Sequence, residues 1–209
     1  MDKRKINRIQ LIIIISLVIN FTNFAQVKTN LEVVTDLVSK SVKDIVQNTE
    51  TIDNKEFAIK FVAADDYSIL RTKLISELQK NDFILFDKNE SKNIGLQTLT
   101  YTLDEVGVKY KKIFKDGILG TYLVERESLI KGSFFIEEKN NKLGKVNAFN
   151  YTSLDTVLYD EVKTLDNIAY QFTSAKLPDE PFFSSLLEPI IAIGTAAIAV
   201  YLFFNIRSN

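Results

Sequence analysis

The C-terminal tail is the feature that most constrains this chain, because it contains a long run of residues without any charge. The run from Ile190 to Ile206 is 17 residues long, and nine of them are Ile, Val, Leu or Phe. As a helix it is roughly 26 Å long at about 1.5 Å per residue, slightly less than the hydrocarbon core of a bilayer at about 30 Å. Pro189 suits the first turn of such a helix. The pattern predicts a transmembrane helix over 189–206.

The side chains of this predicted helix indicate what it could contact. Gly194 and Ala197 belong to a patch of small residues that would let another helix approach closely. A buried core helix is the alternative, since 17 residues is the lower limit for spanning. A core helix usually has a polar face, however, and this run has none. The residues assigned to the membrane anchor are Pro189, Ile190, Gly194, Ala197, Phe203, Phe204 and Arg207.

The first 25 residues have the pattern of a secretory signal peptide. A basic start is followed by an apolar run over 11–19 and then by the small residue Ala25. We expect cleavage between Ala25 and Gln26, and the alternative keeps the segment as an uncleaved N-terminal anchor. Both interpretations place residues 26–188 on the extracytoplasmic side of a membrane. Arg207 then marks the cytoplasmic end, residues 207–209, in agreement with the positive-inside rule, and a helical anchor favours the bacterial inner membrane.

The composition excludes several classes of function. The chain contains no Cys, His or Trp. It therefore has no disulfide, no thiol nucleophile and no lipobox cysteine, and it has neither a Ser-His-Asp relay nor a histidine zinc site. Residues 26–206 contain 21 basic and 26 acidic side chains, a net charge of −5. A nucleic-acid partner needs a basic surface, so we expect none, and we expect no cofactor.

The segment over 26–165 is predicted to form one α+β domain. Apolar residues at helical spacing predict a helix over 30–48 with Asn30 as its cap. Alternation then predicts a strand over 56–63, and Asp65 or Asp66 is expected to cap a second helix that ends at Asn81. Together with an apolar strand over 83–86, these elements make a strand-helix-strand unit.

The residues after 93 are rich in Thr, Tyr and Val, which favours strands joined by tight turns. We expect an antiparallel meander that buries one face against the two helices, giving one sheet with a helical layer. Segment 153–165 is interpreted as irregular or as a short helix, and 166–188, which contains two prolines, as a stiff linker. The strands expected in the meander are 96–103, 105–114, 118–127, 129–138 and 145–151.

Three residue patterns could carry chemistry, and each has a simpler explanation. Asp65 with Asp66, and Glu125 with Glu127, are carboxylate pairs of the kind that glycosidases use, but helix capping and a solvated strand face explain them. The sequence Ser128-Leu-Ile-Lys131 has the spacing of a serine acyltransferase. In a strand, residues three apart point to opposite faces, so we interpret it as a chance match. Aromatic residues at alternating positions are expected to be core: Tyr101, Tyr110, Tyr122, Phe114, Phe134 and Phe135.

No catalytic, cofactor or metal residue follows from these patterns. We therefore expect a non-enzymatic, membrane-anchored interaction or assembly module of the cell envelope. Its expected partners are the lipid bilayer, through the C-terminal helix, and another envelope protein, which could add a strand to an exposed sheet edge. Two alternatives stay open: a carboxylate-dependent cell-wall glycan hydrolase, and a structural subunit that oligomerises through the patch from Gly194 to Ala199.

Overall fold

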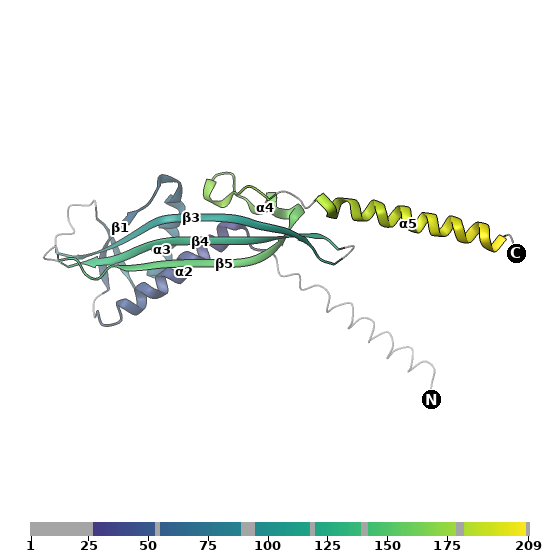
Figure 1. The fold of residues 1–209 in the computed structure, drawn as a ribbon. Helices are drawn as coiled ribbons and strands as arrows, with labels where there is room; N and C mark the ends of the chain where they lie inside the picture. Colours follow the sequence, from purple (N-terminus) through teal and green to yellow (C-terminus); the bar gives the residue numbers. More distant parts are fainter. Residues whose placement is uncertain are drawn as a thin grey trace, which may run out of the picture.

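The computed structural model describes residues 27–52, 55–88, 95–117, 120–138, 142–178 and 182–207. The protein is α+β, with one mixed five-stranded sheet in the order β2-β1-β3-β4-β5. In Figure 1 the long strands β3, β4 and β5 lie side by side, with β5 at the border of the sheet. The strands are β1 Glu56–Val62, β2 Ile84–Asp87, β3 Gln97–Lys115, β4 Tyr122–Glu137 and β5 Asn147–Leu158.

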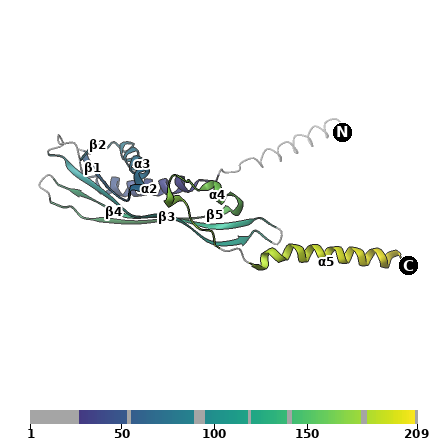
Figure 2. The same cartoon turned by 90° about the horizontal axis from the view of Figure 1, so that it is seen from above.

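The helices α2 (Asn30–Asn48) and α3 (Ser68–Gln79) cover one face of this sheet, as the view in Figure 2 shows. Apolar residues at helical spacing give α2 a buried face, and α3 buries a leucine on each of its three turns. The other face of the sheet has no helix over it among the described residues. The helical residues in the core are Val34, Leu37, Val38, Val42, Ile45, Leu70, Leu74 and Leu78.

The sheet combines two kinds of strand pairing. The unit β1-α3-β2 is a parallel crossover, and β1 also pairs in parallel with β3. Strands β3, β4 and β5 then form the antiparallel meander. Asp116 N donates to Thr121 O at 3.0 Å across the turn between β3 and β4, where Gly117 has a positive φ of 77°.

The meander strands are longer than the pattern predicted. The predicted strands 96–103 and 105–114 are one strand, β3, and the predicted strands 118–127 and 129–138 correspond to β4. Strand β3 continues through a register shift between Leu103 and Glu105, because a bulge absorbs one residue without ending the pairing. Strand β5 runs to Leu158 and takes in the start of a segment that was expected to be irregular or helical. Short turns η2 (Tyr159–Glu161) and α4 (Val162–Leu165) follow it.

The helix caps also differ from the prediction. Thr29, not Asn30, caps α2: its hydroxyl accepts from the backbone N of Glu32, and its own backbone N donates to the Glu32 carboxylate at 2.7 Å. This reciprocal pair is a capping box. Asp65 lies with Asp66 in the short turn η1 (Asp65–Tyr67) and makes no side-chain cap bond, because that turn precedes α3 and leaves Tyr67 in the cap position.

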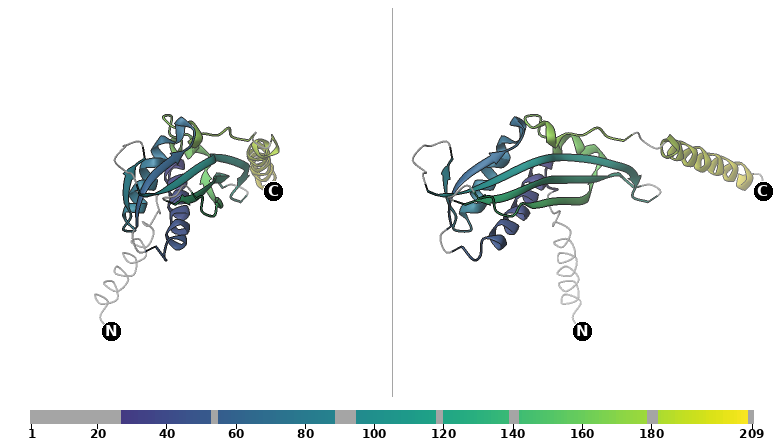
Figure 3. Two further views of the ribbon diagram at one scale, coloured as in Figure 1. Left: turned by 90° about the vertical axis from the view of Figure 1, so that its left-hand side faces the viewer. Right: turned by 60° about the vertical axis from the view of Figure 1, so that its left-hand side comes forward.

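The C-terminal helix α5 spans Phe182–Arg207 and lies apart from the sheet in Figure 1 and in both views of Figure 3. It begins before the predicted anchor, so Pro189 lies inside it and not in its first turn. In the part of the chain that the structure describes, no helix combines enough length with enough apolar character to cross a bilayer. The predicted transmembrane helix over 189–206 is therefore wrong. Its apolar run, at roughly 26 Å, falls short of the roughly 30 Å of a hydrocarbon core.

Candidate functional site

Strand β5 forms one border of the sheet and is twelve residues long. In an antiparallel pair, alternate residues of an edge strand direct their backbone N–H and C=O groups away from the neighbouring strand. Strand β4 satisfies the groups on one side of β5. Within the described ranges, no backbone group bonds to the other side. The outer edge of β5 is therefore a row of free donors and acceptors.

This edge lacks most of the features that protect an edge strand from pairing, although its one charged residue, Asp155, points toward the helical face of the sheet. Natural proteins block such edges with Lys, Pro, bulges or very short strands. The sequence of β5, NAFNYTSLDTVL, contains no Lys, Arg, Pro or Gly, and its register with β4 is continuous from Leu123↔Leu158 to Phe134↔Asn147. Its one charged residue is Asp155. A long, regular and nearly uncharged edge is a ready template for another strand.

The Asp155 carboxylate is held by Arg126 of the neighbouring strand β4. Arg126 Nε donates to Asp155 Oδ1 at 2.8 Å, and Nη2 donates to Oδ2 at 2.5 Å. The Arg126 side chain is fully buried, whereas that of Asp155 is 40% exposed. Two parallel bonds fix both the position and the direction of the carboxylate. The charge of the edge strand is thus neutralised from inside the sheet.

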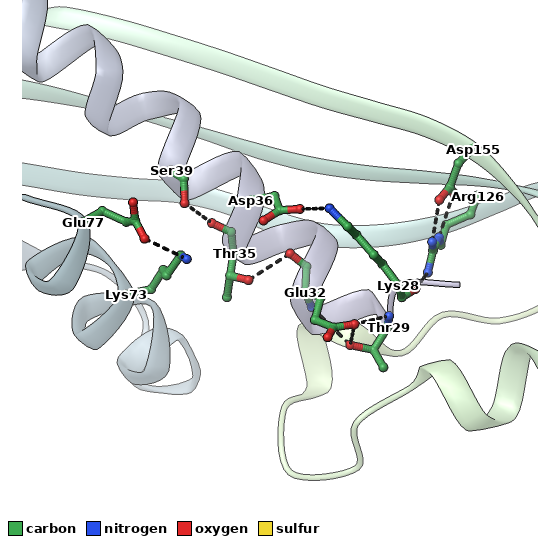
Figure 4. Close-up of polar contacts among 10 residues, drawn as sticks. All are labelled: Lys28, Thr29, Glu32, Thr35, Asp36, Ser39, Lys73, Glu77, Arg126 and Asp155. Carbon is green, nitrogen blue, oxygen red and sulfur yellow. Dashed lines mark hydrogen bonds and ion pairs between the residues drawn. The ribbon is translucent and has the colours of Figure 1, made fainter. Parts of the chain in front are cut away.

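Arg126 also binds the chain at the start of α2 (Figure 4). Its Nη1 donates to the backbone O of Lys28 at 2.8 Å. The same atom donates to Asn30 Oδ1, also at 2.8 Å. The Asn30 amide nitrogen lies 2.8 Å from Tyr110 Oη and 2.7 Å from both Asp166 Oδ1 and Thr173 O. Its two hydrogens are shared among these three acceptors. One buried network therefore joins the beginning of α2, strands β3 to β5 and the segment that follows α4.

Burial shifts two groups of this network toward their neutral forms. It raises the pKa of Tyr110 to about 12, so the phenol stays protonated and can donate to Asp166 Oδ1 at 3.3 Å. Burial also raises the pKa of Asp166, against the lowering effect of the bonds from Tyr110 and Asn30. Thr173, in the turn η3 (Gln171–Thr173), is fully buried beside them. It lies within the segment predicted as a linker.

Aromatic rings hold the first half of β5 against the sheet. The Phe149 ring stacks on Tyr101 of β3, with centroids 5.3 Å apart, and on Tyr151, 6.0 Å apart. It lies over Gly132 of β4, where an added Cβ would be 2.8 Å from the ring and 2.1 Å from Thr102 O. Only glycine leaves room for this arrangement.

Tyr151 fixes β5 to the helical layer. Its hydroxyl donates to the Asp44 carboxylate on α2. Burial, followed by the hydrogen bond to Asp44, raises the pKa of Tyr151 to about 12. Asp44 also borders a shallow cavity of about 330 Å³ beside Asn147, at the beginning of β5. The face of β5 toward the helices is thus well anchored, while its edge stays open.

A larger cavity, of about 580 Å³, lies at the opposite side of the sheet, where β1 continues past the end of β2. Its charged lining is largely paired: Arg71 Nη2 lies 2.9 Å from Asp87 Oδ2, and Lys88 Nζ lies 3.3 Å from Glu137 Oε2. These ion pairs are half-exposed. They offer no arrangement of acid, base and nucleophile.

The structure does not bring the candidate carboxylates together. Asp65 and Asp66 lie in η1 before α3, whereas Glu125 and Glu127 lie on the open face of the sheet. There Glu125 pairs with Lys112 at 3.8 Å and Glu127 with Lys111 at 3.1 Å. Among the described residues, no group of three or more acidic side chains could hold a metal ion.

The Ser128 and Lys131 side chains lie on opposite faces of β4. Ser128 is buried toward the helices, and its hydroxyl has no hydrogen-bond partner among the described residues. Lys131 is on the open face, 2.6 Å from Glu105. Of the aromatic residues expected in the core, Tyr101, Tyr110 and Phe134 are buried, Tyr122 and Phe135 are half-buried, and Phe114 is exposed.

The residues assigned to the membrane anchor all lie on α5. Ile190, Phe203 and Phe204 are exposed there, and Gly194 has no atom within 4 Å of an added Cβ. The predicted cleavage site at Ala25 and Gln26 lies outside the described residues.

Arg126 is the functional residue that the sequence analysis missed. It shares the period-two face of Val124 and Ile130, both fully buried, and is flanked by two outward glutamates. A lone basic residue at an inward position of a strand was the signal that could have identified it. Its partners could not be identified in this way, because Asn30 is 96 residues away.

Comparisons with known proteins give no family. No protein-family model and no curated protein matches the chain. Among the solved structures that match, two have a TM-score of 0.30 each. One is rare lipoprotein B from Shewanella oneidensis, 11% identical, covering 72% of this chain and 93% of that protein. The other is a minor lipoprotein from Acinetobacter baumannii, 15% identical, covering 57% and 89% respectively. At these scores the likeness carries no argument about function.

Proposed function

We propose that this protein is a non-enzymatic interaction module of the cell envelope, and that it binds an extended segment of another protein chain along β5. The observation that carries the proposal is the long, unprotected outer edge of β5. Export to the envelope rests on the signal-peptide pattern that ends at Ala25.

The chemistry of such binding follows from the geometry of a strand. Main-chain hydrogen bonds along the edge supply affinity, and alternate side chains supply selectivity. On the open face β5 presents Asn150, Thr152, Leu154 and Thr156, none of them charged. Leu154 is 60% exposed, and a second strand would cover it. The bound segment is therefore expected to be uncharged where it faces this side.

Photo-crosslinking tests the proposal directly. The crosslinking residue p-benzoylphenylalanine replaces Leu154 in the full chain, produced in cells, and irradiation should give protein adducts. The matched control places the same residue at Ile84 of β2, which is 53% exposed on the same face of the sheet. Adducts at position 154 but not at 84 are expected. The same adduct pattern at both positions would contradict the proposal.

The variant Leu154→Lys adds a functional readout. A lysine on an edge strand opposes pairing without touching the core. We expect it to remove the adducts of a crosslinker at Thr152 while the circular dichroism spectrum stays unchanged. Ile84→Lys should leave those adducts in place.

A further inference from the structure

We propose that the segment that pairs with β5 is β5 of a second copy of this chain, antiparallel and with the two-fold axis at Ser153. The inference rests on the proposed function, since it identifies the partner of the same edge. It would join two five-stranded sheets into one continuous sheet, with α2 and α3 of both copies on the same face.

The face of β5 toward the helices is self-complementary about Ser153. In this register Phe149 lies opposite Val157 of the second copy, and Ser153 lies opposite itself. Tyr151 lies opposite Asp155, so an aromatic side chain faces the carboxylate that Arg126 already neutralises. Directly opposed apolar pairs such as Phe149 with Val157 stabilise antiparallel strands.

The open face matches in the same register. Asn150 lies opposite Thr156, and Thr152 lies opposite Leu154, which is 60% exposed in the single chain. The two Leu154 side chains become diagonal neighbours across the interface, within reach of each other. The most exposed apolar residue of β5 is thus covered by its own copy.

Charge disfavours two alternative registers, those with the axis at Asp155 or at Thr152. Each strand carries one carboxylate, Asp155, which its own Arg126 already neutralises. With the axis at Ser153, the two Asp155 residues are four positions apart, roughly 14 Å along the strands. Moving the axis to Asp155 would place the carboxylates directly opposite each other, and moving it to Thr152 would place Asp155 against Phe149. Both arrangements are unfavourable.

The absence of cysteine from the chain makes the register testable without background. Ser153→Cys introduces a single thiol at the proposed axis. Directly opposed residues of an antiparallel pair have Cα atoms about 4.5 to 5.5 Å apart, within the range that a disulfide bridges. Mild oxidation of cells that produce the full-length variant should convert most of it to a disulfide-linked dimer.

Two further variants fix the register. Asn150→Cys and Thr156→Cys should each stay monomeric when oxidised alone, and they should form a mixed dimer when produced together with different tags. A dimer of either variant alone, with none from Ser153→Cys, would overturn the proposed axis.

Crosslinking at Leu154 separates the two proposals. Adducts that contain two differently tagged copies of this chain support self-pairing. Adducts with another protein, together with the absence of a Ser153→Cys dimer, would overturn self-pairing and leave the edge as the binding site. If position 154 gives no adduct at all, both proposals fail.

Discussion

The two edge strands of the sheet each carry the same type of ion pair, but they differ in length and in the burial of that pair. Each edge strand carries one aspartate paired with an arginine: Asp87 with Arg71 at β2, and Asp155 with Arg126 at β5. At β2 both side chains are about two-fifths exposed, and the strand is four residues long. At β5 the arginine is fully buried, and the strand is twelve residues long.

The difference shows how a fold can keep an edge open. A short strand with exposed charges is blocked against pairing by its length and by its solvated ion pair. A long strand whose only carboxylate is paired with a buried arginine presents a row of backbone N–H and C=O groups without an unpaired charge beside it. The buried arginine costs desolvation, and its bonds to Asn30 and to Lys28 O offset that cost.

The largest expected effect comes from removing the buried arginine. Arg126→Met leaves Asp155, Asn30 Oδ1 and the Lys28 carbonyl without their donor. Loss of one partner of a buried pair costs about 3 to 5 kcal/mol, and the partial exposure of Asp155 favours the lower end, about 3 kcal/mol. Urea unfolding followed by circular dichroism measures it.

The matched control is Arg71→Met at β2, where an exposed pair contributes about 0 to 1 kcal/mol. Equal losses of unfolding free energy in the two variants would contradict the distinction between the edges.

Gly132→Ala should have the next largest effect, because it disturbs the contact between β5 and the sheet. The added methyl group would meet Thr102 O at 2.1 Å and the Phe149 ring at 2.8 Å, so the backbone must shift. Overpacking of this kind costs about 2 kcal/mol. Gly107→Ala on β3 is the control, since its Cβ would have no atom within 4 Å. A similar destabilisation by both substitutions would mean that strand propensity, and not the Phe149 contact, decides the result.

Removing the cap of α2, which lies beside the Arg126 network, should destabilise the protein less. Thr29→Ala removes the capping box of α2, and a lost cap of this kind costs about 1 kcal/mol. Thr29 lies between Lys28 and Asn30, the two residues that Arg126 binds, so the variant should also loosen the support of Asp155. Thermal unfolding measures the loss. Thr35→Ala, further along the exposed side of α2, removes a bond to a helix carbonyl only and should cost less.

The sequence predicts the parts of this fold that depend on local periodicity. The spacing of Val34, Leu37 and Val38 identified α2, and the turn at Gly117 marked the β3-β4 hairpin. The lengths of the strands were not predictable, because register shifts within β3 depend on its pairing with β4. The network around Arg126 was not predictable either, since it joins residues from five separate parts of the chain. The open edge was expected in general terms, but only the strand order shows that it is β5.

A further expected effect is an alkaline loss of stability that involves β5 and not β2. The pKa values of Tyr110 and Tyr151 are raised to about 12 in the folded protein, whereas an unfolded tyrosine titrates near pH 10. Between about pH 10 and pH 12 the folded state therefore binds more protons than the unfolded state. Stability should be constant below this range and fall as the pH rises through it.

Tyr151→Phe tests the contribution of the edge strand. It removes one titrating group on β5, so the urea midpoint should fall less steeply above pH 10 than in the unmodified protein, even if the variant is less stable at pH 7 through loss of the bond to Asp44. Tyr110→Phe should reduce the slope in the same way from within the Arg126 network. An unchanged alkaline slope in Tyr151→Phe would mean that β5 separates from the helical layer before its tyrosine titrates. The edge would then be held by β4 and Arg126 alone.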